Sequence, residues 1–200
     1  VSGGGLLRLK QAGLEVISGV LKDKAEYQKE LTEKDMSQFA MLKKLELDRS
    51  AHEELIKYCE EKGIQFLSTA FDHDSIDLLT ELKIPIYKIP SGEITNLPYL
   101  RHVSRMGKPI IMSTGMATLN EVRVALDILV KGGAEKADIT VLHCNTEYPT
   151  PMEDVNLRAM QTIQNKFDVA VGYSDHTLGI EVDIAAVAMG ATIIAVSYTH

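Results

Sequence analysis

The sequence predicts an α/β fold built on a parallel sheet, namely an incomplete (β/α)8 TIM barrel. Short, β-branched apolar runs alternate with longer segments of helical period from about residue 50 onward. The runs begin roughly 20–30 residues apart, which is the length of one strand–helix unit. Each run is nearly all apolar, as expected of parallel strands that are buried on both faces.

Six of these apolar runs are expected to be strands. They are Ile64–Leu67, Ile84–Ile89, Pro109–Met112, Ile139–Leu142, Val169–Val171 and Thr192–Val196. Six strand–helix units in a row leave two architectures, an eight-stranded barrel or an open, doubly wound sheet. No Gly-x-Gly-x-x-Gly sequence follows any run, so the dinucleotide-binding open sheet lacks its main signal. We therefore predict the barrel, with its first strand missing and its second strand in doubt.

The segments between the runs carry signals of helix starts and stops. Ser50–Glu53 and Thr118–Glu121 match the capping box, in which a hydroxyl and a carboxylate satisfy backbone N–H groups at a helix start. Gly63 follows the first of these helices where it should stop. Further helices are expected over Ser75–Leu82, Leu97–Met106, Asn156–Asn165 and Gly179–Met189.

Composition excludes several classes of protein. The 200 residues are 45% hydrophobic and 24% charged, which is typical of one globular domain or a piece of one. A net charge of −7 without a long Lys/Arg run argues against a nucleic-acid partner. No stretch approaches the roughly 20 apolar residues of a membrane span, and no signal peptide is seen. Cys59 and Cys144 are too few for a disulfide framework, so we expect a cytoplasmic protein.

Polar residues follow most of the predicted strands. They are Ser68-Thr69, Lys88 with Ser91-Gly92-Glu93, Ser113-Thr114-Gly115, His143-Cys144-Asn145-Thr146 and Ser174-Asp175-His176-Thr177. Any one of these groups is explained by turn formation alone. In a barrel, however, the carboxyl ends of the strands form the active site. Because polar residues follow five of the predicted strands, we expect an active site at the carboxyl edge of the sheet.

Lys88 is the most informative single residue, because it lies inside the apolar run Ile86–Ile89. A charged residue in a buried strand is costly unless an anion pairs with it. One interpretation is a structural ion pair with an Asp or Glu. The other is an ammonium that holds a phosphate or carboxylate, helped by hydroxyls and backbone N–H groups at Ser91-Gly92 and Ser113–Gly115.

Two histidines, His143 and His176, each end a predicted strand. Alone, each is explained as a hydrogen-bonded core histidine. Together with Asp175 and Glu93 on the same rim, they would suit a divalent cation such as Mn²⁺ or Mg²⁺. Cys144 shows no activating partner in the sequence, and a buried cysteine is usually inert.

Five ordered motifs resemble those of the N-acetylneuraminate (sialic acid) synthase family. They are Phe66–Phe71, Tyr87–Glu93, Ile111–Met116, Leu142–Pro151 and Gly172–Thr177. The resemblance implies a (β/α)8 barrel in a homodimer that condenses phosphoenolpyruvate with N-acetylmannosamine, or a related 2-acetamido sugar, and water. The products would be a nine-carbon sialic acid and phosphate. An N,N'-diacetyllegionaminate synthase, which uses a 2,4-diacetamido sugar, and a more distant phosphoenolpyruvate-condensing barrel enzyme are the alternatives.

The resemblance also implies roles for individual residues. Lys88 matches the lysine that binds phosphoenolpyruvate, and Glu93 is the candidate for proton transfer or sugar orientation. Hydroxyl residues that match the lining of the phosphoenolpyruvate pocket are Thr69, Ser91, Ser113 and Ser174. Glu93 and Tyr148 match residues that contact the sugar. His176 matches one of two histidines that hold the metal, Mn²⁺ or Mg²⁺, which would polarise the sugar aldehyde.

The ends of the chain depart from the family. We expect a non-matching segment over residues 1–23, the synthase-like barrel over 24–194 and a foreign tail over 195–200. The family's first strand motif would lie before Val1, and Ser197 stands where the second metal-binding histidine is expected. An alternative of another class follows: an inactive fragment whose open sheet edges associate with other chains.

Overall fold

The computed structural model describes residues 46–196. The described chain divides into two compact units, one formed by residues 46–66 and 70–83, the other by residues 67–69 and 84–196. No helix in either unit combines the length and the apolar character that crossing a membrane requires. The expectations for residues 1–23 and for Ser197 lie outside the described residues.

The first unit contains helices α5 (Arg49–Glu61) and α6 (His73–Glu81). Helix α5 begins one residue after Asp48, whose carboxylate accepts the N–H of Ala51 at 2.8 Å. The capping box predicted at Ser50–Glu53 is therefore wrong, since the Ser50 hydroxyl instead donates to Asp48 at 2.8 Å. The predicted stop at Gly63 is confirmed by its φ of 67°, a conformation that glycine adopts without strain.

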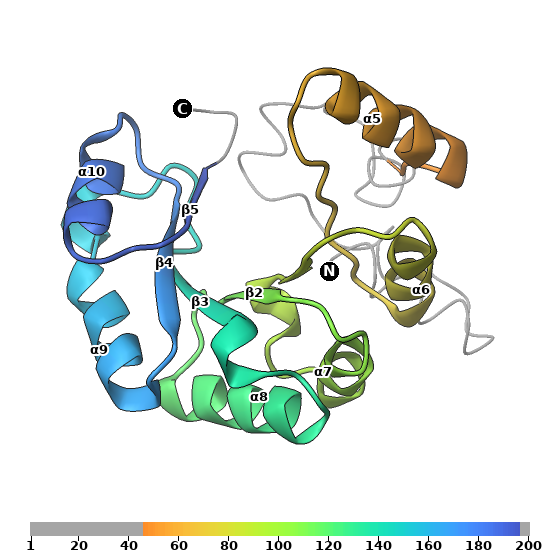
Figure 1. The fold of residues 1–200 in the computed structure, drawn as a ribbon. Helices are drawn as coiled ribbons and strands as arrows, with labels where there is room; N and C mark the ends of the chain where they lie inside the picture. Colours follow the sequence, from red (N-terminus) through yellow and green to blue (C-terminus); the bar gives the residue numbers. More distant parts are fainter. Residues whose placement is uncertain (1–45, 197–200) are drawn as a thin grey trace, which may run out of the picture. The chain divides into compact units, whose positions relative to one another are not determined.

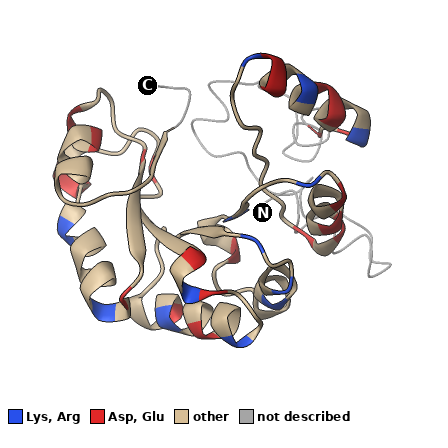
Figure 2. Cartoon of the chain, viewed as in Figure 1, with Lys and Arg blue, Asp and Glu red and all other residues tan. Residues whose placement is uncertain are grey.

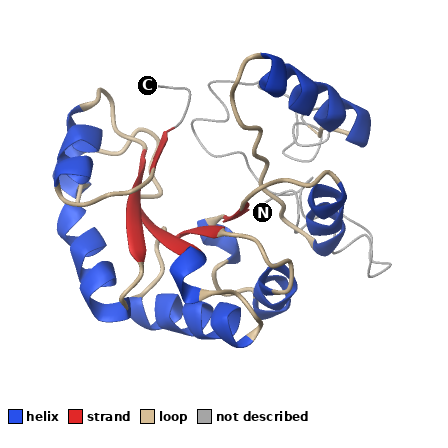
Figure 3. Ribbon diagram, viewed as in Figure 1, coloured by secondary structure: helices blue, strands red, loops and turns tan. Residues whose placement is uncertain are grey.

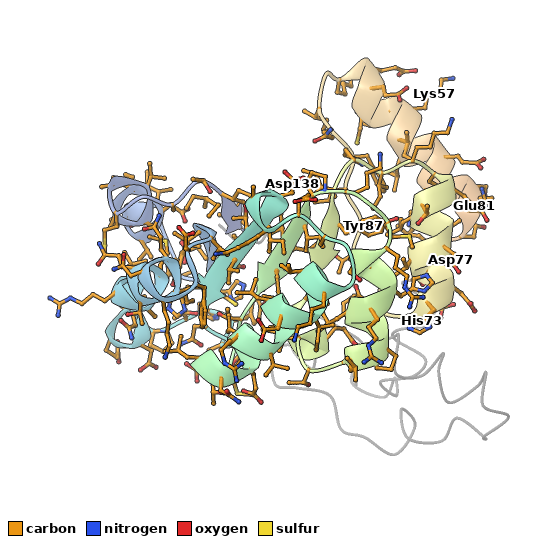
Figure 4. All side chains as sticks on the ribbon, turned by 60° about the horizontal axis from the view of Figure 1, so that its bottom comes forward. Lys57, His73, Asp77, Glu81, Tyr87 and Asp138 are labelled. Atoms are coloured by element: carbon orange, nitrogen blue, oxygen red, sulfur yellow. The ribbon has the colours of Figure 1, made fainter. Side chains whose placement is uncertain are left out.

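Helix α6 starts two residues before the predicted segment, because Asp72 caps it by accepting the N–H of Ser75 at 2.7 Å. Ile76 and Leu79 are buried on one side of α6. His73, Asp77 and Glu81 follow each other at a spacing of four residues on its exposed side (Figure 4). The periodicity that predicted this helix is thus the separation of its apolar and polar faces.

The strand predicted at Ile64–Leu67 is wrong. This segment has no regular secondary structure, and Ile64 and Leu67 are 61% and 42% exposed. A strand needs a hydrogen-bonded neighbour, and no described strand pairs with this run. A short apolar run alone does not reveal whether such a neighbour is present.

The second unit is a parallel sheet whose strands follow the chain order (Figures 1 and 3). The strands are β1 (Tyr87–Ile89), β2 (Ile110–Ser113), β3 (Ile139–Cys144), β4 (Ala170–Asp175) and β5 (Ile194–Val196). A doubly wound sheet reverses its strand order at a switch point. In this sheet, each strand instead pairs with the strands that come before and after it in the sequence. The sheet curls as part of a barrel wall, and the predicted incomplete barrel is confirmed.

Four α-helices cover the convex side of this sheet (Figure 1). They are α7 (Leu97–Ser104), α8 (Leu119–Lys131), α9 (Leu157–Phe167) and α10 (Glu181–Ala188). Short 3-10 helices lie at Ser91–Glu93, Lys136–Asp138 and Met152–Asp154. The capping box at Thr118–Glu121 is confirmed, since each side chain bonds the other residue's backbone N–H. Helices α7, α9 and α10 lie within two residues of the predicted bounds at either end.

The two faces of the sheet differ in chemistry. Tyr87, at the start of β1 (Figure 4), and Ile89, Ile110, Met112 and Val141 point to the helices and are at most 3% exposed. Together with apolar residues of α7, α8 and α9, they form the core. Only Lys88 and Asp175 carry charge within the five described strands (Figure 2).

Candidate active site

The strand register brings polar residues together at the carboxyl edge of the concave face. Lys88 pairs with Ile111 of β2, two residues before Ser113. Cys144, at the end of β3, pairs with Ser174 of β4. Paired residues of parallel strands, and residues two apart on one strand, share a face. Lys88, Ser113, Cys144 and Ser174 therefore line the same face on four successive strands.

Lys88 is held by two hydrogen bonds. Its Nζ donates to Ser113 Oγ at 2.7 Å and to the carbonyl oxygen of Ile89 at 3.0 Å. Burial lowers the pKa of Lys88 from 10.5 to about 8, because the charged form is disfavoured away from water. No carboxylate forms an ion pair with Lys88 within residues 46–196. The structural ion pair is therefore not supported, and a third ammonium proton is available to a ligand.

The turns that follow β1 and β2 pack tightly against each other. Gly115 has a φ of 52°, and a Cβ there would lie 2.6 Å from Ser91 Cβ and 2.7 Å from Ser91 Oγ. Both the conformation and the close approach require glycine at this position. This contact sets the Ser91 hydroxyl beside the turn that begins at Ser113.

Glu93 is a buried carboxylate, 5% exposed, in the 3-10 helix after β1. The side-chain amide of Asn96 donates to Glu93 Oε2. Asn96 also caps α7 by accepting the N–H of Tyr99 at 3.4 Å. The orientation of Glu93 is therefore linked to the start of the helix that follows it.

His176 lies just after β4 and contacts two other predicted site residues. Its Nε2 is 3.3 Å from Ser174 Oγ. Its ring stacks on Tyr148 with centroids 3.9 Å apart and an interplanar angle of 25°. The carbonyl oxygen of His176 accepts the N–H of Thr150 at 2.8 Å. These contacts join the end of β4 to the loop that follows β3.

Thr69 lies in the extended segment 67–69 and is half-buried. Among the hydrogen bonds of the described residues, none joins its side chain to another predicted site residue. The structure thus links Lys88 with Ser113, places Ser91 beside that turn, and links Ser174, His176 and Tyr148.

The expected grouping of His143 and Asp175 with His176 and Glu93 is wrong. His143 precedes Cys144 and so points to the helix side, where its ring centroid is 5.7 Å from that of Tyr173. Burial lowers the pKa of His143. Asp175 points to the same side. Its carboxylate accepts hydrogen bonds from the backbone N–H of Thr177 at 2.8 Å and from the Thr177 hydroxyl at 3.0 Å. Strand alternation separates these residues from the concave face.

The described residues do not fit a metal centre on their own. No group of three His, Cys, Asp or Glu side chains within residues 46–196 is arranged to hold a metal ion. His176 is the one ligand among them that the family resemblance implies, and Ser197, at the expected position of the second, lies outside the described chain. We therefore assign no chemical step to a metal.

Two residues of this region were missed as contributors. Asn96 holds Glu93, and its place directly before Leu97-Pro98 is a helix-start signal that could have revealed it. Cys144 was expected to be an inert buried cysteine. Its sulfur accepts the N–H of Gly115 at 3.2 Å. This contact joins the end of β3 to the turn after β2, and no local sequence signal indicates it.

Comparison with known proteins identifies the class of this barrel. The family model described as "NeuB family" matches residues 12–199. The chain therefore belongs to the NeuB family, in agreement with the predicted resemblance.

Named relatives point the same way. The chain is 54% identical over 176 residues, or 88% of its length, to the N,N'-diacetyllegionaminic acid synthase of Campylobacter jejuni, covering 53% of that protein. It is 35% identical to the human N-acetylneuraminate-9-phosphate synthase over 75% of its length and 41% of the human protein. The chain spans about half the length of the legionaminic acid synthases that it matches.

A solved structure supports the fold. The N-acetylneuraminic acid (sialic acid) synthetase from Leptospira borgpetersenii, in complex with citrate, superposes with a TM-score of 0.75 at 33% identity. The match covers 84% of this chain and 58% of that one. The fold of the described chain is thus shared with part of a solved synthetase structure.

Proposed function

We propose that this chain provides the phosphoenolpyruvate side of a synthase that condenses phosphoenolpyruvate with a 2-acetamido sugar and water. The observation that carries the proposal is Lys88, a half-buried ammonium without a carboxylate partner in the described chain. It lies on a concave barrel face beside the Ser113 hydroxyl. The names of the relatives, which include two synthases of acidic sugars, support the same activity.

In this proposal, Lys88 binds the anionic groups of phosphoenolpyruvate. An ammonium in a half-buried, hydroxyl-lined position attracts a phosphate or carboxylate more strongly than it would in water. Ser91, Ser113 and Ser174 would add hydroxyl contacts, and Thr69 would add one from the preceding segment. With a pKa of about 8, Lys88 remains mostly protonated at neutral pH.

The proposed reaction forms a carbon–carbon bond. The enol carbon of phosphoenolpyruvate attacks the aldehyde carbon of the open-chain sugar, and water adds to the carbon that bears the phosphate. The resulting tetrahedral adduct loses phosphate by cleavage of its C–O bond. Lys88 and the hydroxyls would position the reactants and stabilise charge. The buried Glu93 carboxylate would transfer a proton or orient the sugar.

The sugar side of the site would involve Tyr148 and Glu93. Identity to the legionaminic acid synthases of Campylobacter jejuni and Legionella pneumophila is 54% and 48%, against 35% for the human N-acetylneuraminate-9-phosphate synthase. This difference favours a 2,4-diacetamido sugar over N-acetylmannosamine. Both sugars belong in the test.

The proposal also includes a metal ion, a dimer and a cytoplasmic location. His176 would supply one imidazole to a divalent cation, Mn²⁺ or Mg²⁺, and the full assembly would be a homodimer. The free thiols of Cys59 and Cys144 suit a reducing, cytoplasmic setting.

The test is release of inorganic phosphate from phosphoenolpyruvate with Mn²⁺ and either amino sugar. The 200-residue chain would be assayed beside a chain extended at both ends to the length of its relatives. Release by the extended chain alone would support the inactive-fragment alternative for the shorter one. Release by neither, with any amino sugar, would overturn the synthase proposal.

Binding provides a second arm of this test. We expect Lys88→Ala to abolish phosphoenolpyruvate binding measured by calorimetry, because the site loses its cation. Lys108→Ala is the matched control, since Lys108 is exposed and lies just before β2, at the opposite edge of the sheet. Unchanged affinity in Lys88→Ala would contradict the assigned role.

A further inference from the structure

Cys144 is a buried thiol that the proposed condensation does not use. It is the last residue of β3 and is 5% exposed. Burial raises the pKa of its thiol, so the group is neutral at physiological pH and is a poor nucleophile. A role for Cys144 therefore has to come from its hydrogen bonds.

The sulfur of Cys144 contacts the last residue of the turn after β2. The N–H of Gly115 donates to Sγ at 3.2 Å. Two residues earlier in the same turn, Ser113 Oγ accepts a hydrogen bond from Lys88 Nζ at 2.7 Å. The turn Ser113–Gly115 therefore connects the sulfur of Cys144 to the ammonium of Lys88.

The turn Ser113–Gly115 is confined from two directions. Ser91 lies against Gly115 so closely that a Cβ would be 2.6 Å from Ser91 Cβ. Cys144 holds the Gly115 amide by a hydrogen bond. A buried N–H that loses its acceptor costs free energy, so removal of the sulfur would release the turn on this side.

We infer that Cys144 is a positioning residue whose sulfur fixes the turn Ser113–Gly115 and so keeps the Ser113 hydroxyl against the Lys88 ammonium. The inference rests on the proposed function, because the hydroxyl and the ammonium are the groups proposed to bind phosphoenolpyruvate.

The test compares Cys144→Ala, Cys144→Val and Cys144→Ser in the full 200-residue chain. We expect phosphoenolpyruvate binding by calorimetry to weaken about tenfold in the alanine and valine variants, the effect of one lost hydrogen bond that orders a binding turn. The serine variant keeps a hydroxyl and should lose less than about threefold. Valine retains the packing volume, so it replaces alanine if the alanine variant does not fold. Cys59→Ala, on α5 in the other unit, is the control for loss of a thiol.

A double-mutant cycle separates positioning from a purely structural effect. If Cys144 acts through Ser113, the variant that combines Ser113→Ala with Cys144→Ala binds no more weakly than Ser113→Ala alone. Losses that multiply would overturn the inference, as would unchanged binding in both Cys144→Ala and Cys144→Val.

Hydrogen exchange of the Gly115 amide provides a readout that is independent of the ligand. We expect exchange at least tenfold faster in Cys144→Ala and Cys144→Val than in the unmodified chain. If the unmodified chain does not bind phosphoenolpyruvate, the proposed function fails, and this exchange decides the positioning role. An unchanged exchange rate of the Gly115 amide in both variants would then overturn the positioning role of Cys144.

Discussion

Lys88 illustrates how a single side chain can carry information about both fold and chemistry. Its position inside an apolar run predicted a buried cation, and the structure places its Nζ 2.7 Å from Ser113 Oγ. The sequence left an ion pair open as an alternative, since it does not show which carboxylates approach a strand from elsewhere. That question is decided by packing between distant segments.

The lowered pKa of Lys88 gives a prediction for the pH dependence of ligand binding. The ammonium is needed for anion binding, and its pKa of about 8 lies within an accessible range. We expect phosphoenolpyruvate affinity to be constant below pH 8 and to fall about tenfold for each pH unit above it. Calorimetry between pH 6.5 and 9.5, in buffers of constant ionic strength, measures this fall.

The matched variant for this prediction is Lys88→Arg. A guanidinium stays charged throughout the same range because its pKa is above about 12. Its affinity, even if weaker, should therefore not fall between pH 8 and 9.5. A pH profile that is flat in the unmodified chain would contradict the assigned role of the ammonium.

Individual helices were predictable where a local signal is complete. The capping box of α8 was read from Thr118 and Glu121 alone, and both of its hydrogen bonds are present. The similar pattern at Ser50–Glu53 failed because Asp48 lies two residues earlier and accepts the N–H of Ala51 instead. Competing caps of similar strength cannot be ranked from sequence alone.

The α8 cap provides a prediction about stability. We expect Thr118→Ala to lower the free energy of unfolding by about 1 kcal/mol, the usual cost of a lost N-cap. The effect is measured by urea unfolding followed by circular dichroism. Phosphoenolpyruvate affinity should not change, because, among the described residues, the side chain of Thr118 bonds only Glu121 and none of the four concave-face residues.

Thr162→Ala is the control for that substitution. Thr162 lies inside α9, where its hydroxyl donates to the carbonyl oxygen of Arg158 at 3.0 Å and caps nothing. Alanine has a higher helix propensity than threonine, so this variant should be neutral or slightly stabilising. An equal loss of stability in both variants would argue against the cap as the cause.

The architecture of the second unit was predictable because every strand–helix unit repeats the same signal. Five of the six predicted strands are present, and the barrel was preferred over the open sheet from the absence of a glycine-rich motif. The exception, Ile64–Leu67, failed because a strand depends on a neighbour.

The candidate site was predictable where it depends on local pattern and not where it depends on contacts between distant segments. Ser113 and Ser174 could be placed by strand alternation, whereas the contact between Gly115 and Cys144 depends on how two strands pair.

The ends of the described sheet give a prediction for the whole chain. Strands β1 and β5 each pair with one described strand only, and an open strand edge favours association between chains. Val196, in β5, is 56% exposed. We expect Val196→Lys to reduce concentration-dependent association, measured by size-exclusion chromatography with light scattering, because lysine disfavours pairing at an edge.

Val130→Lys is the comparison for this effect. Val130 is 42% exposed on α8, so the substitution adds the same charge away from a strand edge. Association should then stay at the level of the unmodified chain. An equal reduction in both variants would mean that net charge, rather than the β5 edge, controls association.

In the proposed synthase, the arrangement of the barrel wall would separate the binding of the two substrates. Lys88 and the serines lie on or next to consecutive strands, where backbone pairing fixes them, while Tyr148 belongs to a connecting loop with more freedom to vary. A family with this layout can exchange one sugar for another by remodelling loops and leave the anion anchor intact. Relatives named for legionaminic, neuraminic and pseudaminic acids are the diversity that such a division of labour would produce.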